Sequence, residues 1–201
     1  DNPELMEQFR RELQGFYSVI KGKDNAIRFA FLTGVTKLGK MSIFSGLNNL
    51  NDISMDARYA DICGISEQEL KSYFGESVKT LAEMNGLSEE ECYKKLASMY
   101  DGYHFHYRSP GIYNPFSLMR ALASGEIDDY WFSSGTSTYL IRQMQRFRTD
   151  VTTLDEVFAF SSSFDRPTEK MSDALPLLYQ SGYLTIKGYD PLTKGFHLGI
   201  P

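Results

Sequence analysis

The chain has 201 residues, a net charge of −5, 42% hydrophobic residues and 23% charged residues. This length suffices for one large or two small domains with a sizeable core, and the composition is that of an ordinary soluble globular protein. The acidic balance argues against broad binding to nucleic acid or to membrane surfaces, although it leaves room for a local basic patch. Cys63 and Cys92 lack metal or redox spacing and no signal peptide or membrane span is visible, so we expect a cytoplasmic protein. The chain begins without Met and ends in a strand-like Gly-Ile-Pro, so we also expect it to be a piece of a longer protein.

Residues 3–21 are predicted to form a helix, with Asn2 as its cap and Pro3 in its first turn. Its apolar face consists of Leu5, Phe9, Leu13, Phe16 and Ile20. The apolar run that follows, Ile27–Thr33, suits a strand buried on both faces, as in a parallel sheet between helices. A helix followed by a buried strand is half of an α/β unit, so its neighbouring strands must come from elsewhere.

Directly after this strand, Gly34, Gly39 and Lys40 have the phosphate-loop spacing G-x-x-x-x-G-K. The next position should be Ser or Thr, whose hydroxyl ligates the Mg²⁺ of the nucleotide, but it is Met41. A thioether is a poor ligand for a hard cation, and Gly46 disfavours the helix that should follow. We therefore interpret the stretch as a core strand with a polar tip.

A helical hairpin is predicted between residues 66 and 99. Ser66 with Glu69 and Ser88 with Glu91 have the spacing of capping boxes, and each pair precedes a helical pattern of apolar residues. Asn-Gly at residues 85–86 separates the two helices.

The stretch Tyr100–Leu122 combines turn signals with many aromatic residues. Within it, Asn114 is predicted to cap a helix that has Pro115 in its first turn. The residues expected to point inward are Phe116, Met119 and Leu122. His104 and His106 would share one face of a strand and could ligate a metal, but no third ligand is near in sequence. Aromatic residues packed beneath a long loop are the more frequent explanation.

The last part of the chain is predicted to contain two helices and a β-hairpin. A helix reaches Phe147 with Leu140 and Met144 inward, and Ser161–Ser163 marks a loop. Around 170–181 a second helix contains Pro176, so it either begins near residue 173 or is kinked. Alternation at 183–187 and at 196–200 indicates a hairpin with a long turn over 188–195. Helix, Ser-Gly break and hairpin are the closing part of a winged-helix pattern, which serves for protein contact as well as DNA binding.

Six stretches are spread along the chain from residue 31 to residue 187: FLTGVTK (31–37), SIFSGLNNLNDIS (42–54), YDGYHF (100–105), YNPFSL (113–118), YWFSSGT (130–136) and LLYQSGYLTIK (177–187). Together they resemble the AAA-ATPase-like proteins of gut Bacteroides and some other anaerobes. The resemblance implies that a phosphate-loop half lies upstream of this chain and that a nuclease-like domain of the PD-(D/E)XK type often lies downstream.

The resemblance also implies roles for individual residues. Thr33, Thr36 and Lys37 become candidates to touch the γ-phosphate or the attacking water, and Gly39 and Lys40 become a coincidental near-match. In the lid, where related ATPases place a second sensing element, the corresponding residues are Asp101, Tyr103 and Asn114. ATP and Mg²⁺ would then be cofactors of the full-length protein, and this chain alone would not bind them tightly.

The expected fold is mixed α/β and mostly helical, in three parts. Residues 1–55 are the C-terminal part of an ATPase core with a remnant of a P-loop-type parallel sheet, 56–128 a helical lid, and 129–201 a winged-helix-like domain. The expected function is ATP-dependent switching in the full-length protein, with the missing phosphate-loop half as partner. The alternative is a module without ATPase activity that binds protein or nucleic acid through its aromatic loop and winged helix.

Overall fold

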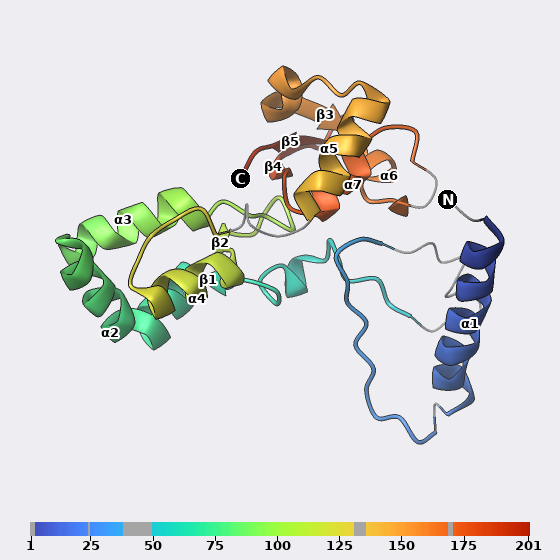
Figure 1. Ribbon diagram of the computed structural model, residues 1–201, viewed down its shortest axis with the longest axis horizontal. Coiled ribbons are helices and arrows are strands. Elements are labelled where there is room, and N and C mark those ends of the chain that lie inside the picture. Colours follow the sequence, from blue (N-terminus) through green and yellow to red (C-terminus); the bar gives the residue numbers. More distant parts are fainter. Residues whose placement is uncertain (1–2, 24, 38–49, 131–135, 169–170) are drawn as a thin grey trace.

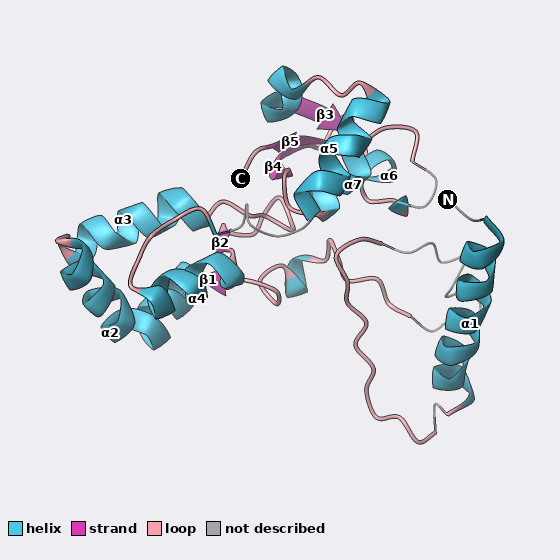
Figure 2. Ribbon diagram, viewed as in Figure 1, coloured by secondary structure: helices cyan, strands magenta, loops and turns pink. Residues whose placement is uncertain are grey.

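The structure is a computed structural model, and it describes residues 3–23, 25–37, 50–130, 136–168 and 171–201. Within these ranges helices predominate and are accompanied by two small antiparallel sheets (Figures 1 and 2). In chain order the elements are α1 (Pro3–Gly22), η1 (Ala57–Tyr59), β1 (Ile65–Ser66), α2 (Glu67–Asn85), α3 (Glu89–Tyr100), β2 (Ile112–Tyr113), α4 (Pro115–Ser124), α5 (Thr136–Phe147), η3 (Val151–Glu156), β3 (Val157–Ala159), α6 (Ser161–Phe164), α7 (Leu175–Gln180), β4 (Thr185–Asp190) and β5 (Gly195–Gly199). The fold is therefore mixed α/β, as predicted.

Helix α1 forms where the sequence predicts it and stands apart from the other elements (Figure 1). Its apolar face is uncovered: the exposed fractions are 46% for Leu5, 53% for Phe9, 40% for Leu13 and 70% for Phe16. An amphipathic helix gains most of its stability by burying such a face, so this face lacks the cover that its pattern requires. In the part of the chain that the structure describes, no helix combines the length and the apolar character needed to cross a membrane.

The strand predicted over Ile27–Thr33 is wrong for the chain as described. These residues are extended but belong to neither sheet, and Phe29 is 79% exposed. The rings of Phe29 and Phe31 stack with centroids 6.5 Å apart, as side chains at i and i+2 do on an extended backbone. A strand needs a neighbour to pair its N–H and C=O groups, and no described segment of the chain pairs with this one.

Helices α2, α3 and α4 with the short β1–β2 ladder form a helical unit, residues 65–130. Both predicted capping boxes are present, at Ser66 with Glu69 and at Ser88 with Glu91. Helix α2 ends on Gly86, whose φ of 65° lies in the left-handed region that glycine adopts without strain. The core of this unit joins the three helices, and its buried residues are Leu70, Val78, Leu81, Ala82, Cys92, Leu96, Tyr100, Tyr113, Leu118 and Ala121.

Helix α4 starts as predicted, because the Asn114 side chain accepts a hydrogen bond from the Ser117 amide. The predicted inward face is confirmed for Leu122 but wrong for Phe116, which is 56% exposed, and for Met119, which is 45% exposed. The buried face consists of Ser117, Leu118 and Ala121, with Leu122 packed at its edge. The helix thus turns the face of Leu118 and Ala121 toward the core that it shares with α2 and α3.

The remaining elements form a C-terminal unit, residues 136–199, in which a three-stranded antiparallel sheet of order β3–β5–β4 packs with α5, α6 and α7. Leu140 of α5 is buried and Met144 and Phe147 pack with it, as predicted. Ile186 and Leu198 face a second cluster with Phe164. The two clusters meet at Leu175, so the unit has its own apolar core.

Two local predictions in this unit need correction, those for residues 161–163 and for the hairpin turn, and the first of the two alternatives for the helix with Pro176 is confirmed. Ser161–Ser163 form α6 and are not a loop. Pro176 creates no kink, because α7 begins at Leu175 and the ring therefore lies in the first turn, where no intrahelical N–H is needed. The hairpin turn is shorter than predicted, because β4 continues to Asp190 and β5 begins at Gly195, with a bulge between Ile186 and Gly188.

The capping box of α3 gives a first prediction. Ser88→Ala removes the side chain that accepts a hydrogen bond from the Glu91 amide, and losing such a cap typically costs about 1 kcal/mol. Ser98→Ala, at an exposed site in the same helix, should be neutral or slightly stabilising. Urea unfolding of both variants measures the difference, and equal stabilities would contradict the cap's contribution.

Candidate functional site

Lys37 lies at the end of the extended segment after α1, and its ammonium group contacts two carboxylates. Nζ is 2.9 Å from Oδ2 of Asp52 and 2.7 Å from Oδ1 of Asp165. Asp52 precedes η1 by a few residues, and Asp165 directly follows α6. The contact therefore joins positions that are 15 and 128 residues from Lys37 in the sequence.

The backbone of Lys37 is bound as well. Its amide donates to Oε1 of Gln180 at 2.6 Å, and its carbonyl accepts a hydrogen bond from the Thr168 amide at 3.3 Å. Gln180 ends α7, and its Nε2 donates to the carbonyls of Phe164 and Arg166 at 3.2 and 2.6 Å. One glutamine side chain thus holds Lys37, α7 and the segment after α6 together. We call Lys37, Asp52, Asp165 and Gln180 the Lys37 cluster.

The charges of the cluster stabilise one another. Burial alone favours neutral lysine, yet hydrogen bonds and Coulombic attraction from Asp165 and Asp52 raise the pKa of Lys37 above its ordinary 10.5. Burial likewise disfavours ionised Asp52, but its hydrogen bonds with Lys37 and Ser54 lower its pKa from 3.8 to about 2. Both Oδ1 contacts of Asp52 come from Ser54, through its amide at 3.1 Å and its hydroxyl at 2.8 Å. The ammonium and this carboxylate are therefore charged at neutral pH.

The other two predicted sensing residues share the segment of Lys37. Thr33 is exposed and Thr36 is half-buried. The phosphate-loop spacing starts at Gly34 and continues into residues 38–49, which lie outside the described residues. Gly39, Lys40 and Met41 belong to this range. Thr33, Thr36 and Lys37 thus lie close together along one short stretch of chain.

The predicted lid residues lie together at the junction of α3 and α4, and each has a local partner. Oδ1 of Asp101 accepts from the Gly102 amide at 2.6 Å. Tyr103 forms an isolated antiparallel bridge with Ile112. Asn114 caps α4, and its own amide donates to the Tyr100 carbonyl at 2.8 Å. No hydrogen bond or ion pair between described residues joins this trio to Thr33, Thr36 or Lys37.

The loop after Asp101 is bound to the C-terminal unit by a reciprocal pair of hydrogen bonds. The His104 amide donates to Oγ1 of Thr185 at 2.7 Å, and this hydroxyl donates to the His104 carbonyl at 3.1 Å. Thr185 is only 3% exposed and lies at the start of β4. The histidine rings have protein partners too: Nδ1 of His104 is 3.0 Å from the Ser109 carbonyl, and Nδ1 of His106 accepts from the Arg108 amide.

The same loop places Tyr107 in an aromatic cluster of the C-terminal unit. The Tyr107 ring stacks on Tyr189 with centroids 4.5 Å apart, and Tyr189 lies 4.9 Å from Phe196. Phe164 continues the cluster, with its ring 5.4 Å from Phe196 and 4.6 Å from Tyr179. The expectation that aromatic residues of this loop pack inward is confirmed for Tyr107. Through Tyr107, the loop of the helical unit packs against the β4–β5 sheet.

Sequence reasoning missed Asp52, Asp165, Gln180 and Thr185. A signal for Asp52 was present, because Asp-x-Ser is a frequent side-chain-to-backbone turn, which the structure shows at Ser54. Gln180 is the polar end of the apolar helix LPLLYQ, and a polar residue at such a position requires hydrogen-bond partners. No local pattern identifies Asp165, whose partner is 128 residues away.

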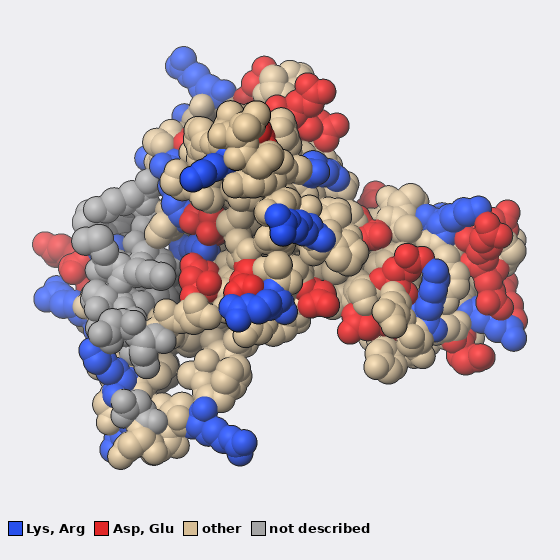
Figure 3. Space-filling view, turned by 180° about the vertical axis from the view of Figure 1, so that it is seen from behind, with Lys and Arg blue, Asp and Glu red and all other residues tan. Residues whose placement is uncertain are grey.

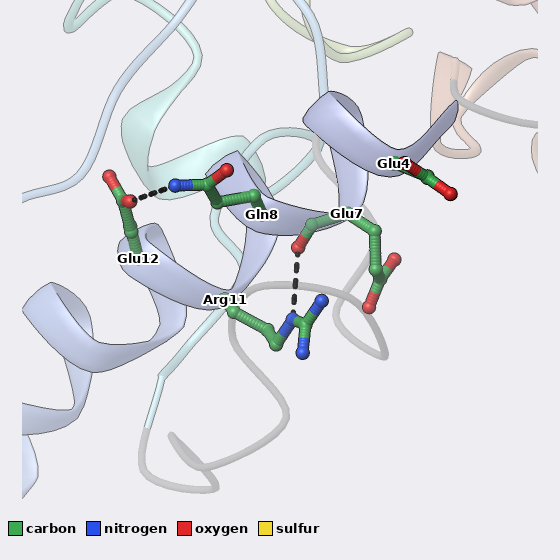
Figure 4. Close-up of a pocket in the computed structure, with 5 residues that line it drawn as sticks. All are labelled: Glu4, Glu7, Gln8, Arg11 and Glu12. Carbon is green, nitrogen blue, oxygen red and sulfur yellow. Dashed lines mark hydrogen bonds between the residues drawn. The ribbon is translucent and has the colours of Figure 1, made fainter. Parts of the chain in front are cut away.

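A shallow hollow on α1 does not extend this site. Figure 4 shows its lining, Glu4, Glu7, Gln8, Arg11 and Glu12, which all come from the polar face of one helix. Gln8 donates to Glu12 at 3.2 Å, and Arg11 donates to the Glu7 carbonyl. A single helix face cannot enclose a ligand, and none of the predicted site residues lines the hollow.

Comparison with known proteins gives one family match. Residues 1–44 match the model of a family described as a predicted AAA-ATPase, AAA-ATPase-like. The match includes α1 and the segment of Thr33, Thr36 and Lys37, and it stops before the helical unit. The resemblance to AAA-ATPase-like proteins is thus supported for the first part of the chain.

A longer similarity covers nearly the whole chain. An Azotobacter chroococcum mcd 1 protein, described as an uncharacterized protein in the vnfD 5′ region, is 36% identical over 184 residues, or 92% of this chain. The chain spans only 33% of that relative's length. No solved structure matches the chain.

The Lys37 cluster gives a second prediction. Lys37→Met leaves two carboxylates facing each other without their ammonium. Exposed ion pairs contribute up to about 1 kcal/mol and breaking a buried one costs about 3–5 kcal/mol, so this partly buried contact should cost about 1–2 kcal/mol. Lys79→Met, at an exposed site on α2, is the matched control. Urea unfolding tests this, and equal stabilities of the two variants would refute it.

A third prediction concerns pH. A carboxylate whose pKa is lowered by folding stabilises the fold above its unfolded value and loses that contribution as pH falls through the folded value. The stability difference between wild type and Asp52→Asn should therefore be constant from about pH 5 to 9 and shrink between about pH 4 and 2. At alkaline pH, the contribution of Lys37 to the free energy of unfolding is complete below the ordinary lysine pKa of 10.5 and declines above it. Unfolding curves across this range, at fixed ionic strength, measure both limits, and a difference that persists unchanged at pH 2 would count against the assignment.

Proposed function

We propose that this chain supplies the nucleotide-sensing and lid elements of an AAA-like ATPase module, and that the complete protein uses ATP with Mg²⁺ to switch its conformation. The observation that carries the proposal is the uncovered apolar surface of α1 and of the extended segment after it. The similarity of residues 1–44 to a predicted AAA-ATPase family covers the same two elements.

This surface has the form expected of half an α/β unit. Leu5, Phe9 and Phe16 line one face of α1, and the extended segment exposes Phe29 at 79% and Val35 at 66%. An apolar helix face beside an unpaired extended segment is completed by a parallel sheet that pairs the segment and covers the helix. The partner that we propose is a phosphate-loop half of the same protein. The Azotobacter relative is about three times as long as the matched region, which leaves room for such a half.

The proposed sensing residues follow from the position of the segment. In open α/β sheets, ligands bind beyond the carboxyl ends of the strands. Thr33, Thr36 and Lys37 lie at the carboxyl end of the extended segment, and they offer hydroxyl and ammonium donors suited to a γ-phosphate. Asp101, Tyr103 and Asn114 are proposed to act in the lid, where their local hydrogen bonds would keep the loop in one conformation.

The C-terminal unit is proposed to be winged-helix-like. Its order is helix α5, strand β3, helices α6 and α7, then strands β4 and β5 joined by a short turn. The first strand pairs with the last, which gives the sheet order β3–β5–β4. This order supports a compact winged-helix arrangement in which the β4–β5 turn is the wing.

A second function, protein binding without ATP hydrolysis, is favoured by the outer face of the same sheet. Phe158 and His197 are paired across β3 and β5 and share that face, with ring centroids 5.2 Å apart. Phe160 extends the row at 5.9 Å from Phe158, and the two phenylalanines are 49% and 47% exposed. Exposed aromatic rows of this kind are typical of interaction surfaces.

Duplex DNA fits the C-terminal unit less well. In the proposed winged-helix arrangement α7 would be the helix that enters a groove, but Pro176, Leu177 and Leu178 are buried and Gln180 binds the Lys37 backbone. On the face shown in Figure 3, basic side chains are interspersed with acidic ones and form no continuous stripe among the residues drawn in colour. Affinity for DNA depends on a concentrated positive charge, which this face does not offer.

The proposed function gives a fourth prediction, made for the full-length protein. Donors that contact the γ-phosphate act mainly on the transition state, so Thr33→Val and Lys37→Ala should each lower kcat by about 10²–10³-fold while ATP affinity changes only a few-fold. Thr80→Val, at an exposed site on α2, should keep wild-type turnover. Steady-state ATP hydrolysis and calorimetry decide the matter. Wild-type turnover in folded Lys37→Ala would remove Lys37 from the proposed site, and absent hydrolysis in the wild type would favour the binding function.

A further inference from the structure

The Lys37 cluster places a proposed sensing residue in direct contact with the C-terminal unit. Side chain and main chain of Lys37 both participate, through Asp165, Thr168 and Gln180. Any displacement of Lys37 must therefore be transmitted to, or break, its contacts with the segment after α6 and with the end of α7. The sequence motifs predict no functional role for Asp52, Asp165 or Gln180.

The contact of the Lys37 ammonium with Asp52 and Asp165 is partly solvated, so another anion can replace the two carboxylates. The side chains of Lys37, Asp52 and Asp165 are 23%, 39% and 18% exposed, so water reaches all three. Ion pairs that water reaches contribute less net free energy than fully buried ones, because solvent can replace each partner. A phosphate with two negative charges is thus a competitive acceptor for the same ammonium.

We propose that Asp52, Asp165 and Gln180 are positioning residues for Lys37, and that the γ-phosphate of a bound nucleoside triphosphate withdraws the Lys37 ammonium from the two carboxylates. This inference rests on the proposed function. In the state described by the structure, the carboxylates hold the ammonium and the C-terminal unit is bound to the N-terminal segment. In the triphosphate state the ammonium turns to the phosphate, and its contacts with Asp52 and Asp165 are broken.

The consequence for the C-terminal unit follows from charge. Once the ammonium leaves, Asp52 and Asp165 lose the cation that they share, and with it the attraction that holds them to the segment of Lys37. Asp165 is the C-terminal cap of α6, and Gln180 joins the residues around it to α7 through the carbonyls of Phe164 and Arg166. The segment of Lys37 is then held to the residues around α6 and α7 by its two backbone hydrogen bonds, to Gln180 and from Thr168, so residues 161–181 open more readily. A nucleoside diphosphate lacks the competing group and leaves the contact intact.

Thermodynamic linkage gives the direction of a test. If the triphosphate must break the carboxylate contact, weakening that contact in advance increases triphosphate affinity. Asp165→Asn and Asp52→Asn should each tighten binding of a non-hydrolysable ATP analogue with Mg²⁺ by about 5-fold or more, the lower end of typical coupling between sites. ADP affinity should not change. Asp56→Asn is the matched control, because Asp56 lies in the same segment but pairs with Arg58.

The experiment is calorimetry on the full-length protein with AMP-PNP·Mg²⁺ and with ADP·Mg²⁺, combined with amide hydrogen exchange over residues 161–181. In the wild type, AMP-PNP should increase exchange in this region, whereas ADP should not. Asp52→Asn, at the more exposed carboxylate, keeps the test decisive where Asp165→Asn does not fold.

Three results would overturn the inference. Unchanged AMP-PNP affinity in both asparagine variants means that the carboxylates do not compete with the γ-phosphate. Equal tightening of AMP-PNP and ADP, or the same effect in Asp56→Asn, means that only long-range charge is involved. In both cases wild-type nucleotide binding still supports the proposed function. Absence of nucleotide binding by the wild-type full-length protein refutes the proposed function, and this inference with it.

Discussion

An ammonium group shared by two carboxylates fixes the N-terminal segment against the C-terminal unit. Lys37 supplies the positive charge, and Asp52 and Asp165 lie within 3 Å of it on either side. The position of Lys37 is restricted further, because its backbone amide donates to the Gln180 side chain at 2.6 Å at the same time. The position of the segment after α6 depends on this arrangement, since Gln180 also holds its carbonyls.

The described chain has separate apolar cores joined by polar and aromatic contacts. The helical unit buries its core among α2, α3 and α4, and the C-terminal unit buries its own beneath the sheet. Between them lie the Thr185 hydroxyl with its two hydrogen bonds to His104, and the Tyr107 ring on Tyr189. Joints of this composition resemble transient interfaces more than cores, so relative movement of the units is the natural expectation.

Sequence predicted the features that depend on neighbouring residues. Both capping boxes, the Gly86 helix end and the Asn114 cap were found because each is decided within about four residues. The strand over Ile27–Thr33 was not, because strand formation depends on a partner that lies outside the segment. The site was predicted only in part. Lys37 was selected, but its partners Asp165 and Gln180 are 128 and 143 residues away, and no periodicity encodes such a pairing.

The distances along the chain also bear on the order in which the molecule folds. The hairpin of α2 and α3 and the hairpin of β4 and β5 close short loops, and short loops cost little chain entropy and form quickly. The Lys37 bond closes a loop of 128 residues and can form only after both units have taken shape. An interaction that is absent from the folding transition state slows unfolding and leaves the folding rate nearly unchanged. Lys37 would then determine how long the assembled state persists and have little effect on how fast it forms.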